Sequence, residues 1–228
     1  MAANIYASIQ PSFFSSWSLS FGKRLTDCMV AIAGLILVSP IIVTIAALIL
    51  ITSGKPIFFR QWRLGRDGQK FQLLKFRTMK VSAPATGPRV TRTGDGRITP
   101  TGRWLRKWKL DELPQLLNVI RGDMTLVGPR PDLEEFWALA SVEDQAVLAL
   151  TPGITGAASL AFCDEERLLA AVAPDHLIGF YVEELLPQKA RLDLDYARRA
   201  TFRGDCGILL RTFVCSFARG RALVERNR

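Results

Sequence analysis

CMVAIAGLILVSPIIVTIAALILITSG, residues 28–54, is the stretch that decides where the rest of this chain sits. No charged residue falls between Asp27 and Lys55. An α-helix needs about 20 predominantly apolar residues to cross a bilayer, so the run is long enough to span one. Ser39-Pro40 lies almost at its centre. Because proline removes a backbone donor and clashes with the preceding turn, the sequence predicts a membrane helix with a central break.

The charges beside the apolar run leave two topologies open. Lys23 and Arg24 precede it, and Lys55 with three arginines up to residue 66 follows it. Basic flanks favour the cytoplasmic side of a membrane. A Pro-kinked spanning helix would carry one basic flank across, whereas a re-entrant hairpin of two half-helices would keep both on one side. Ser39 can hydrogen-bond a backbone group that the break frees.

Composition bounds the class of protein. The chain has 228 residues, a net charge of +9, four cysteines without metal-binding spacing and a single histidine. This excludes a His-based metal cluster and predicts reduced core cysteines. The net charge is +7 over residues 55–80 and +5 over 81–131, but −10 over 132–197. Basic blocks beside a membrane segment suit anionic headgroups and phosphate-rich substrates. Nucleic acid is the other usual partner of basic chains, but the membrane segment disfavours it here.

The remaining segments predict an α+β, membrane-embedded monotopic protein. Residues 1–22 contain no charged side chain and several aromatics, which indicates an interfacial or disordered tail ahead of the re-entrant segment 23–54. Residues 56–80 alternate around a turn at 65–68, which predicts a β-hairpin. Residues 132–149 and 164–200 read as acidic helices, 151–156 as a turn-rich strand, and 208–224 as a basic amphipathic helix on the membrane. Residues 55–228 would form a cytoplasmic, membrane-associated catalytic domain.

Asp111-Glu112 is the candidate catalytic centre. The apolar residues after the pair recur at helical spacing, at Leu113, Leu116, Leu117 and Ile120. Pro114 is tolerated only in a first turn, and Gly122 ends the helix. We therefore expect Asp111 near the N-cap and Glu112 in the first turn, where the helix dipole favours ionised carboxylates.

An acidic pair at a helix start is usually a cap, but the surrounding charges favour a site. The basic residues on either side are Arg103, Arg106, Lys107, Lys109 and Arg130. Arginine binds phosphate oxygens bidentately, and carboxylates serve as nucleophiles and as Mg²⁺ ligands. Together these residues predict phosphoryl transfer at a membrane surface.

In these motifs the chain resembles the bacterial sugar transferases, the small monotopic polyprenol-phosphate phosphoglycosyl transferases that begin glycoconjugate assembly. The matching elements are Lys23-Arg24 with Asp27, Ser39-Pro40 in the apolar run, Arg63-Leu-Gly65, Lys75-Phe-Arg-Thr-Met79, Leu110-Asp-Glu-Leu-Pro-Gln-Leu116, Asn118-Val119, Gly122-Asp-Met124, Leu126-Val-Gly-Pro-Arg-Pro131 and Pro152-Gly-Ile-Thr-Gly156. The likeness runs from Lys23 to about Leu210. With no membrane helix ahead of Lys23, the chain is similar to the family's minimal catalytic form.

The resemblance implies a mechanism. Asp111 would attack the sugar-bearing phosphate of a UDP-sugar and release UMP. Polyprenol (undecaprenyl) phosphate would then take the phosphosugar from the aspartyl intermediate. Glu112 would hold Mg²⁺. The residues that match the family's substrate-phosphate positions are Arg106, Arg130, Lys75, Arg77 and Asp193.

The resemblance also implies a place in the cell. It favours a re-entrant hairpin with its break at Ser39-Pro40 over a spanning helix. The protein would lie on the cytoplasmic face of a bacterial inner membrane, with membrane lipids and downstream glycosyltransferases as further partners, in polysaccharide, lipopolysaccharide or other glycan assembly. Ala157 and Cys163 stand where many relatives have other residues. Cys163 takes the place of an arginine, whose role Arg167 could fill. The sequence therefore predicts no particular sugar. The alternatives are a non-catalytic membrane-anchored scaffold and a membrane-tethered nucleic-acid binder.

Overall fold

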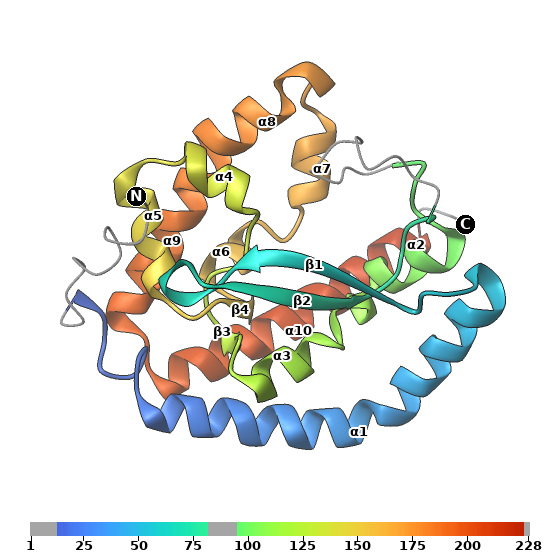
Figure 1. Ribbon diagram of the computed structural model, residues 1–228, viewed down its shortest axis with the longest axis horizontal. Helices are drawn as coiled ribbons and strands as arrows, with labels where there is room; N and C mark the ends of the chain where they lie inside the picture. Colours follow the sequence, from blue (N-terminus) through green and yellow to red (C-terminus); the bar gives the residue numbers. More distant parts are fainter. Residues whose placement is uncertain (1–12, 82–94, 226–228) are drawn as a thin grey trace.

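The computed structural model describes residues 13–81 and 95–225, with side chains through residue 216. It combines many helices with two small two-stranded sheets, which confirms a mixed helix and sheet fold. The longest helix, α1 (Phe21–Ser53), runs along one edge of the molecule and changes direction in its C-terminal half (Figure 1). Residues 1–12 of the predicted tail lie outside the described residues.

Hydrogen bonds within α1 explain how the helix continues through Pro40. Proline has no N–H, so the carbonyl of Ile36, four residues earlier, loses its helical donor. The Ser39 hydroxyl donates to that carbonyl at 2.8 Å. This confirms the predicted role of Ser39 at the break. The Pro40 carbonyl in turn accepts from the Thr44 hydroxyl at 2.8 Å, so side chains of the same helix serve the backbone on both sides of the proline.

Only one face of α1 packs against the rest of the protein. Ala31, Ile45 and Ile49 are buried on that face, whereas Leu37 and Ile51 are 79% and 82% exposed on the other. The helix is long and apolar enough to cross a membrane. An exposed apolar surface of this extent marks a contact with lipid or with another protein. The helix is therefore compatible with membrane association.

A β-hairpin lies across the middle of the molecule in Figure 1. Strands β1 (Phe58–Leu64) and β2 (Lys70–Phe76) are antiparallel, and the 3₁₀ turn η4 (Arg66–Gly68) joins them, as the alternating sequence predicted. The fully buried Asn118 accepts a hydrogen bond from the Leu74 N–H at 3.0 Å and donates to the Gln72 carbonyl at 2.8 Å. This amide fixes the helix that carries it, α3 (Gln115–Arg121), against β2.

The second sheet pairs β3 (Thr125–Val127) with β4 (Gly153–Thr155) in parallel. A Cβ atom on Gly156 would lie 2.2 Å from the carbonyl oxygen of Gly128, so only glycine allows the two backbones to approach this closely. The turn-rich strand predicted at 151–156 is confirmed.

The other helical elements are α2 (Pro100–Lys107), η5 (Leu110–Glu112), α4 (Glu134–Leu139), α5 (Val142–Gln145), η6 (Ala146–Ala149), α6 (Ala157–Ala161), α7 (Glu165–Ala170), η7 (Pro174–His176), α8 (Leu177–Phe180), the π-helical η8 (Tyr181–Leu185), α9 (Leu186–Arg199) and α10 (Phe202–Glu225).

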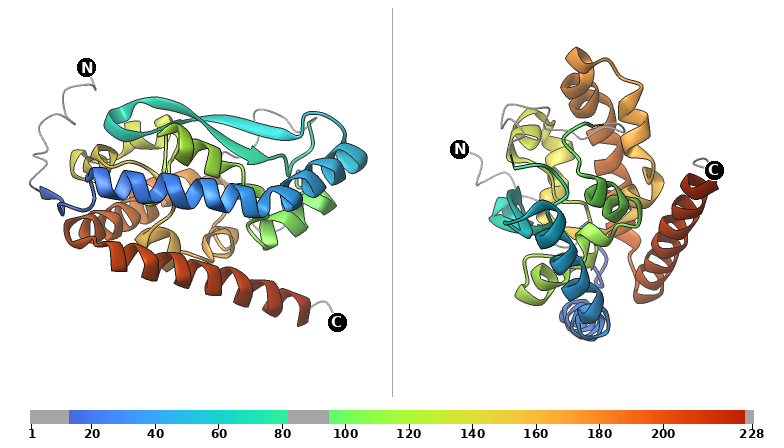
Figure 2. Two further views of the ribbon diagram at one scale, coloured as in Figure 1. Left: turned by 90° about the horizontal axis from the view of Figure 1, so that it is seen from below. Right: turned by 90° about the vertical axis from the view of Figure 1, so that its right-hand side faces the viewer.

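Helix α10 starts at the same end of the molecule as α1 and runs in the same general direction (Figures 1 and 2). A helix is confirmed where the sequence predicted a basic amphipathic one, although it begins earlier, at Phe202. Residues 13–22, the described part of the predicted N-terminal tail, lie against α9 and α10. Phe14 is buried, Ser18 donates to the Ala197 carbonyl at 2.8 Å, and Trp17 donates to Asp205 at 2.8 Å.

Candidate active site

The Asp111-Glu112 pair lies in the short turn η5, one turn ahead of α3. Lys109 turns the chain in a left-handed conformation, with φ at 56°, and it is the N-cap of that turn. Asp111 lies two residues after this N-cap and Glu112 is in the first turn, as the sequence predicted, although this turn is separate from α3. Leu110 and Leu113 pack with Ile45, Ile49, Phe76 and Leu105. These contacts place the acidic pair against the C-terminal half of α1.

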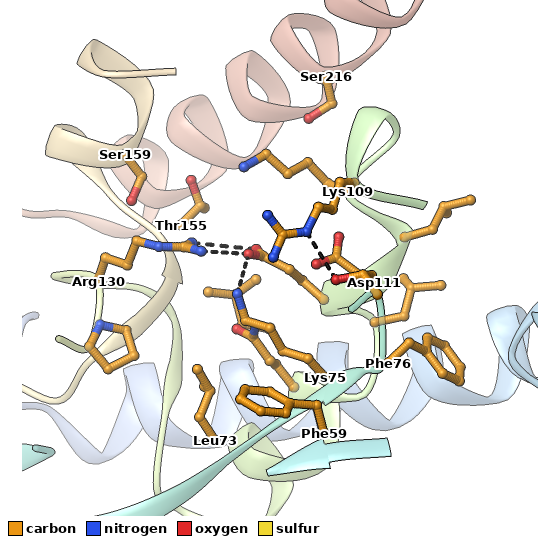
Figure 3. Close-up of a pocket in the computed structure, with 18 of the residues that line it drawn as sticks. Phe59, Leu73, Lys75, Phe76, Lys109, Asp111, Arg130, Thr155, Ser159 and Ser216 are labelled. Carbon is orange, nitrogen blue, oxygen red and sulfur yellow. Dashed lines mark hydrogen bonds and ion pairs between the residues drawn. The ribbon is translucent and has the colours of Figure 1, made fainter. Parts of the chain in front are cut away.

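Two cations hold the Glu112 carboxylate. Lys75 of β2 donates to Oε1 at 2.9 Å, and Arg130 donates to Oε1 at 2.5 Å and to Oε2 at 3.4 Å (Figure 3). Burial disfavours the ionised form of Glu112, but Arg130, Lys75 and Lys109 overcome that effect and hold its pKa well below the usual range. Glu112 is therefore ionised at neutral pH. Its charge keeps Arg130 and Lys75 in place beside the site.

Asp111 has the opposite environment. It is 5% exposed, and its Oδ1 atom is buried with no hydrogen-bond partner. Burial raises the pKa of Asp111 and the neighbouring Glu112 charge raises it further, while Lys75, Arg106 and Lys109 act against that rise. The helix dipole is therefore not the main influence on Asp111, because desolvation by burial is the largest effect on its pKa. A carboxylate with few hydrogen bonds and a raised pKa is a better nucleophile than a solvated one.

Arg106 enters the same cavity from α2. Its Nε donates to the Thr78 hydroxyl at 2.9 Å, and its Nη1 lies 3.4 Å from a carboxylate oxygen of Glu166. Gly102 permits this arrangement, because a Cβ there would lie 2.1 Å from the Thr78 carbonyl oxygen. The Glu166 side chain is about half exposed, so this long ion pair leaves Arg106 available to an anionic ligand.

Arg77 lines the cavity but bonds to the end of α1. It donates to the carbonyls of Ser53, Gly54 and Lys55, at 2.6, 2.8 and 2.8 Å. These are carbonyls that a helix C-terminus leaves without donors. The structure therefore engages both Nη atoms of Arg77 with backbone oxygens.

Asp193 lies apart from the other predicted site residues. It is buried on α9 and accepts a hydrogen bond from the Ala158 N–H at 2.9 Å, at the start of α6. Burial raises its pKa to about 6. Asp193 is not part of the cavity wall. The structure thus brings together Asp111, Glu112, Lys75, Arg106 and Arg130, and it gives Asp193 a contact between two helices.

The cavity in front of Asp111 has a volume of about 1360 Å³ and is open to solvent. On one side it is lined by a buried polar cluster that the sequence did not predict. Arg63 pairs with Asp132 at 3.1 Å, Tyr181 donates to Asp132, and Lys189 donates to Tyr181 at 3.0 Å and pairs with Glu165 at 3.1 Å. These residues come from five distant segments, and only Arg63 lies in a motif that the sequence analysis singled out.

The residues present fit a metal ion only if substrate phosphates and water complete its coordination shell. No group of three or more His, Cys, Asp or Glu side chains that could hold a metal occurs among the described residues. Mg²⁺ is often held by one or two carboxylates, with substrate phosphates and water completing its shell. Asp111 and Glu112 could supply that donor set, and Asp111 Oδ1 is the atom without a partner. The fit is to a metal ion that arrives with a phosphorylated substrate.

The geometry defines a class of site. A desolvated carboxylate faces a cavity whose cations are Lys75, Arg106, Lys109 and Arg130. Such a set of groups can bind phosphate oxygens and present a nucleophile to phosphorus. Phosphoryl transfer onto an aspartate is the chemistry it suits best.

Comparison with known proteins agrees with this class. The family model of the bacterial sugar transferases matches residues 18–219, so the chain belongs to that family and is a transferase. The UDP-glucose:undecaprenyl-phosphate glucose-1-phosphate transferase of Caulobacter vibrioides is 37% identical over 193 residues, which cover 83% of this chain and 67% of the relative. The exopolysaccharide production protein ExoY of Sinorhizobium fredii is 42% identical over 149 residues, covering 59% of this chain and 66% of the relative.

A longer relative matches over a shorter part. The UDP-N-acetylgalactosamine-undecaprenyl-phosphate N-acetylgalactosaminephosphotransferase of Aeromonas hydrophila is 39% identical over 117 residues, covering 51% of this chain but 28% of the relative. The Caulobacter and Aeromonas relatives are named for different sugars, glucose and N-acetylgalactosamine.

Proposed function

We propose that this protein transfers a sugar 1-phosphate from a UDP-sugar to polyprenol (undecaprenyl) phosphate, as a membrane step that begins polysaccharide or glycan assembly. The observation that carries the proposal is the contrast at η5. Glu112 contacts Lys75 and Arg130 through both of its oxygens, whereas the adjacent Asp111 has a desolvated carboxylate whose Oδ1 atom has no hydrogen-bond partner, in the wall of a cationic cavity. The names of the relatives supply the substrate classes.

The reaction proceeds in two half-reactions. An Asp111 oxygen attacks the sugar-bearing phosphorus of the UDP-sugar, a new O–P bond forms, and the bond to the bridging oxygen breaks. UMP leaves with that electron pair. An oxygen of the lipid phosphate then attacks the same phosphorus, which frees the Asp111 carboxylate and yields a lipid-linked sugar diphosphate. Arg130, Lys75 and Arg106 offset the negative charge of the phosphates in both steps.

Mg²⁺ belongs to the same proposal. Glu112 and Asp111 are the residues that would hold it, and it would neutralise phosphate charge as a Lewis acid. Because Lys75 and Arg130 already occupy the Glu112 oxygens, the metal would share Glu112 with those cations.

We also propose that α1 is a re-entrant hairpin on the cytoplasmic face of a bacterial inner membrane. Both halves of α1 are fastened to the same body. Near its start, Arg24 donates to the Val119 and Ile120 carbonyls at 2.5 and 2.9 Å, and near its end Ile45 and Ile49 pack beneath Phe76. A helix held along its length against one domain supports entry into one leaflet better than passage to the other side. The lipid product would then be passed to downstream glycosyltransferases on the same face.

Substitution of Asp111 tests the function. The purified protein is incubated with a panel of UDP-sugars, Mg²⁺ and undecaprenyl phosphate, and UMP is measured. We expect one UDP-sugar to give turnover, and Asp111→Asn to lower it about 10³-fold or more while the thermal unfolding midpoint stays near that of the wild type. Without the lipid, wild type should release at most one UMP per protein. Silence across the panel would contradict the activity, and intact function of Asp111→Asn in cells would favour the scaffold.

Topology needs a separate experiment. Cysteines introduced at Lys23 and Lys55 are labelled in sealed inverted vesicles with a reagent that does not cross membranes. Labelling of both positions from the same face is expected, and labelling from opposite faces would show that α1 spans the bilayer.

A further inference from the structure

Lys109 lies beside the active site and forms no ion pair with a carboxylate among the described residues. Three cations near Asp111 are already paired: Lys75 and Arg130 with Glu112, and Arg106 with Glu166. Arg77 donates to backbone carbonyls instead. On the far wall, Arg63 and Lys189 have carboxylate partners too. Lys109 is exposed within the open cavity, two residues before Asp111. Its position and its free charge suit a ligand that carries its own negative charge.

Three hydroxyl-bearing residues line the cavity around Lys109. Figure 3 shows the Lys109 side chain extending towards Thr155 of β4 and Ser159 of α6, with Ser216 of α10 above it in this view. The Ser159 hydroxyl oxygen is buried and has no hydrogen-bond partner. An ammonium group and hydroxyl donors that meet without a carboxylate form a site for an anion.

A bond between β4 and α10 fixes this wall. The Thr212 hydroxyl donates to the Ile208 carbonyl at 2.8 Å, so its hydrogen is used within α10. The Thr155 hydroxyl lies 2.8 Å from the Thr212 hydroxyl and must therefore be the donor of that bond. Thr155 therefore has no hydrogen left for an anion, and its bond instead fixes β4 against α10 beside Lys109. Helix α10 is thus a wall of the active-site cavity as well as an exposed helix.

The cavity continues from this anion site into an apolar gap between α1 and α10. Val38 and Ile41 line it from α1, and Leu209 and Phe213 line it from α10. The outer face of α1 beside the gap is apolar and exposed. By contrast, the opposite end of the cavity carries the polar cluster around Asp132. The α1/α10 side therefore suits a phosphate attached to an apolar chain, and the Asp132 side suits a polar nucleotide.

We propose that Lys109, Ser159 and Ser216 bind the phosphate of the lipid acceptor, and that the gap between α1 and α10 takes the first units of its isoprenoid chain. This deepens the proposed function and rests on it. The acceptor phosphate would reach Asp111 from the membrane side of the cavity, while UMP leaves from the polar side. Lys109 would act as a specificity-determining residue for the second half-reaction.

Steady-state kinetics on the full chain in lipid nanodiscs separate the two substrates. In a two-step transfer through a covalent intermediate, each kcat/KM reports its own half-reaction. Lys109→Met removes the charge but keeps the chain length, and the left-handed backbone at this position costs either residue the same. We expect kcat/KM for undecaprenyl phosphate to fall roughly 10- to 30-fold, as for loss of a charge-assisted hydrogen bond. Because Lys109 also opposes the rise in the pKa of Asp111, kcat/KM for the UDP-sugar should fall as well, but by a factor about three or more times smaller. Ser159→Ala and Ser216→Ala should each lower the lipid value about two- to fivefold.

Lys107→Met is the matched control, because Lys107 is a neighbouring lysine outside the cavity wall. It should change neither specificity constant by more than about twofold. Methyl phosphate, which has no isoprenoid chain, separates the two parts of the site. Lys109→Met should impair its use as an acceptor as well, whereas Phe213→Ala should impair only undecaprenyl phosphate. Equal losses for both substrates in Lys109→Met, or no loss for the lipid, would overturn the inference. Absence of UMP release by the wild type would instead overturn the proposed function.

Discussion

Two clusters of buried carboxylates lie along α1, and they differ in whether every carboxylate oxygen has a hydrogen-bond or ion-pair partner. Near the start of α1, Asp205 of α10 accepts from Lys23 at 2.5 Å, from Trp17 at 2.8 Å and from Tyr196 at 2.6 Å. Asp27 accepts from Thr125 in the same cluster. Near the other half of α1, Glu112 is paired, but the Oδ1 atom of Asp111 has no partner.

The difference separates structure from chemistry. Buried polar groups are nearly always hydrogen-bonded, so an orphaned carboxylate oxygen needs an explanation. The saturated cluster joins the N-terminal tail, α1 and α10 into one unit. The unsaturated one faces a cavity, where a ligand can complete it. The same residue type thus holds the fold in one place and presents a reactive group in the other.

The largest expected effect is on stability, in the saturated cluster. Asp205→Ala would leave the buried Lys23 ammonium with only Asp27, 3.8 Å away, and would strip Trp17 and Tyr196 of their acceptor. Removing one partner of a buried ion pair costs about 3–5 kcal/mol, which thermal unfolding should show as a large fall in the midpoint. UMP released per folded molecule, without lipid, should stay near the wild-type value.

A double variant sharpens this test. Lys23→Met with Asp205→Leu removes both charges, and replacement of a buried pair by apolar groups is often neutral. We expect the double variant to regain most of the stability that Asp205→Ala loses. A single variant as stable as the wild type would show that this cluster does not hold α1 to α10.

The next effect is on catalysis, in the unsaturated cluster. Glu112→Gln would leave Lys75 and Arg130 without their partner, and we expect kcat/KM for the UDP-sugar to fall about 10²- to 10³-fold. The Glu112 charge raises the pKa of Asp111, so its removal should lower that pKa. Because Asp111 must be ionised to attack, activity is lost as the pH falls through its pKa. The acid limb of the pH profile should therefore move to lower pH in Glu112→Gln.

Glu134→Gln provides the control for that experiment. Glu134 forms an exposed ion pair with Lys70 at 2.7 Å, and such surface pairs contribute little. Both the rate and the pH profile of this variant should match the wild type. An acid limb that stays in place in Glu112→Gln would contradict the assignment of Asp111 as the ionising group.

Local patterns predicted the elements that depend on neighbours in sequence. The alternation around Gly65–Gly68 predicted the hairpin, and Gly122 ends α3 in the left-handed conformation expected of a helix stop. The bond from Ser39 to the Ile36 carbonyl follows from proline chemistry alone. The acidic pair with its flanking cations was also readable, because Asp111, Arg106 and Lys109 lie within six residues.

What depends on distant contacts was not readable. Helical spacing predicted Asp111 near the start of one continuous helix, but Leu110 and Leu113 pack against α1 and the acidic pair lies in a separate turn ahead of α3. The raised pKa of Asp111 comes from the burial of its own carboxylate, which no local pattern reveals. The polar cluster around Asp132 joins segments more than a hundred residues apart, from Arg63 to Lys189. Sequence motifs locate the reactive residues, whereas the packing of distant segments around them sets their pKa values and their contacts.

The smallest expected effect is at Arg77, and it tests whether this residue caps the end of α1 or binds a substrate phosphate. Arg77→Met would deprive the carbonyls of Ser53, Gly54 and Lys55 of their donor at the end of α1. Loss of hydrogen bonds from a charged group should cost about 1–3 kcal/mol, a shift of a few degrees in the thermal midpoint. Arg77→Lys should recover part of that loss, since an ammonium group can reach fewer of the three oxygens than the guanidinium fork. If instead the KM for the UDP-sugar rose about tenfold with the thermal midpoint unchanged, Arg77 would belong with Arg130 at the substrate phosphates, as the family resemblance implied. If Arg77 caps α1, then Arg77→Met must lower the thermal midpoint before it affects the KM, because the end of α1 lies beside the strand that carries Lys75.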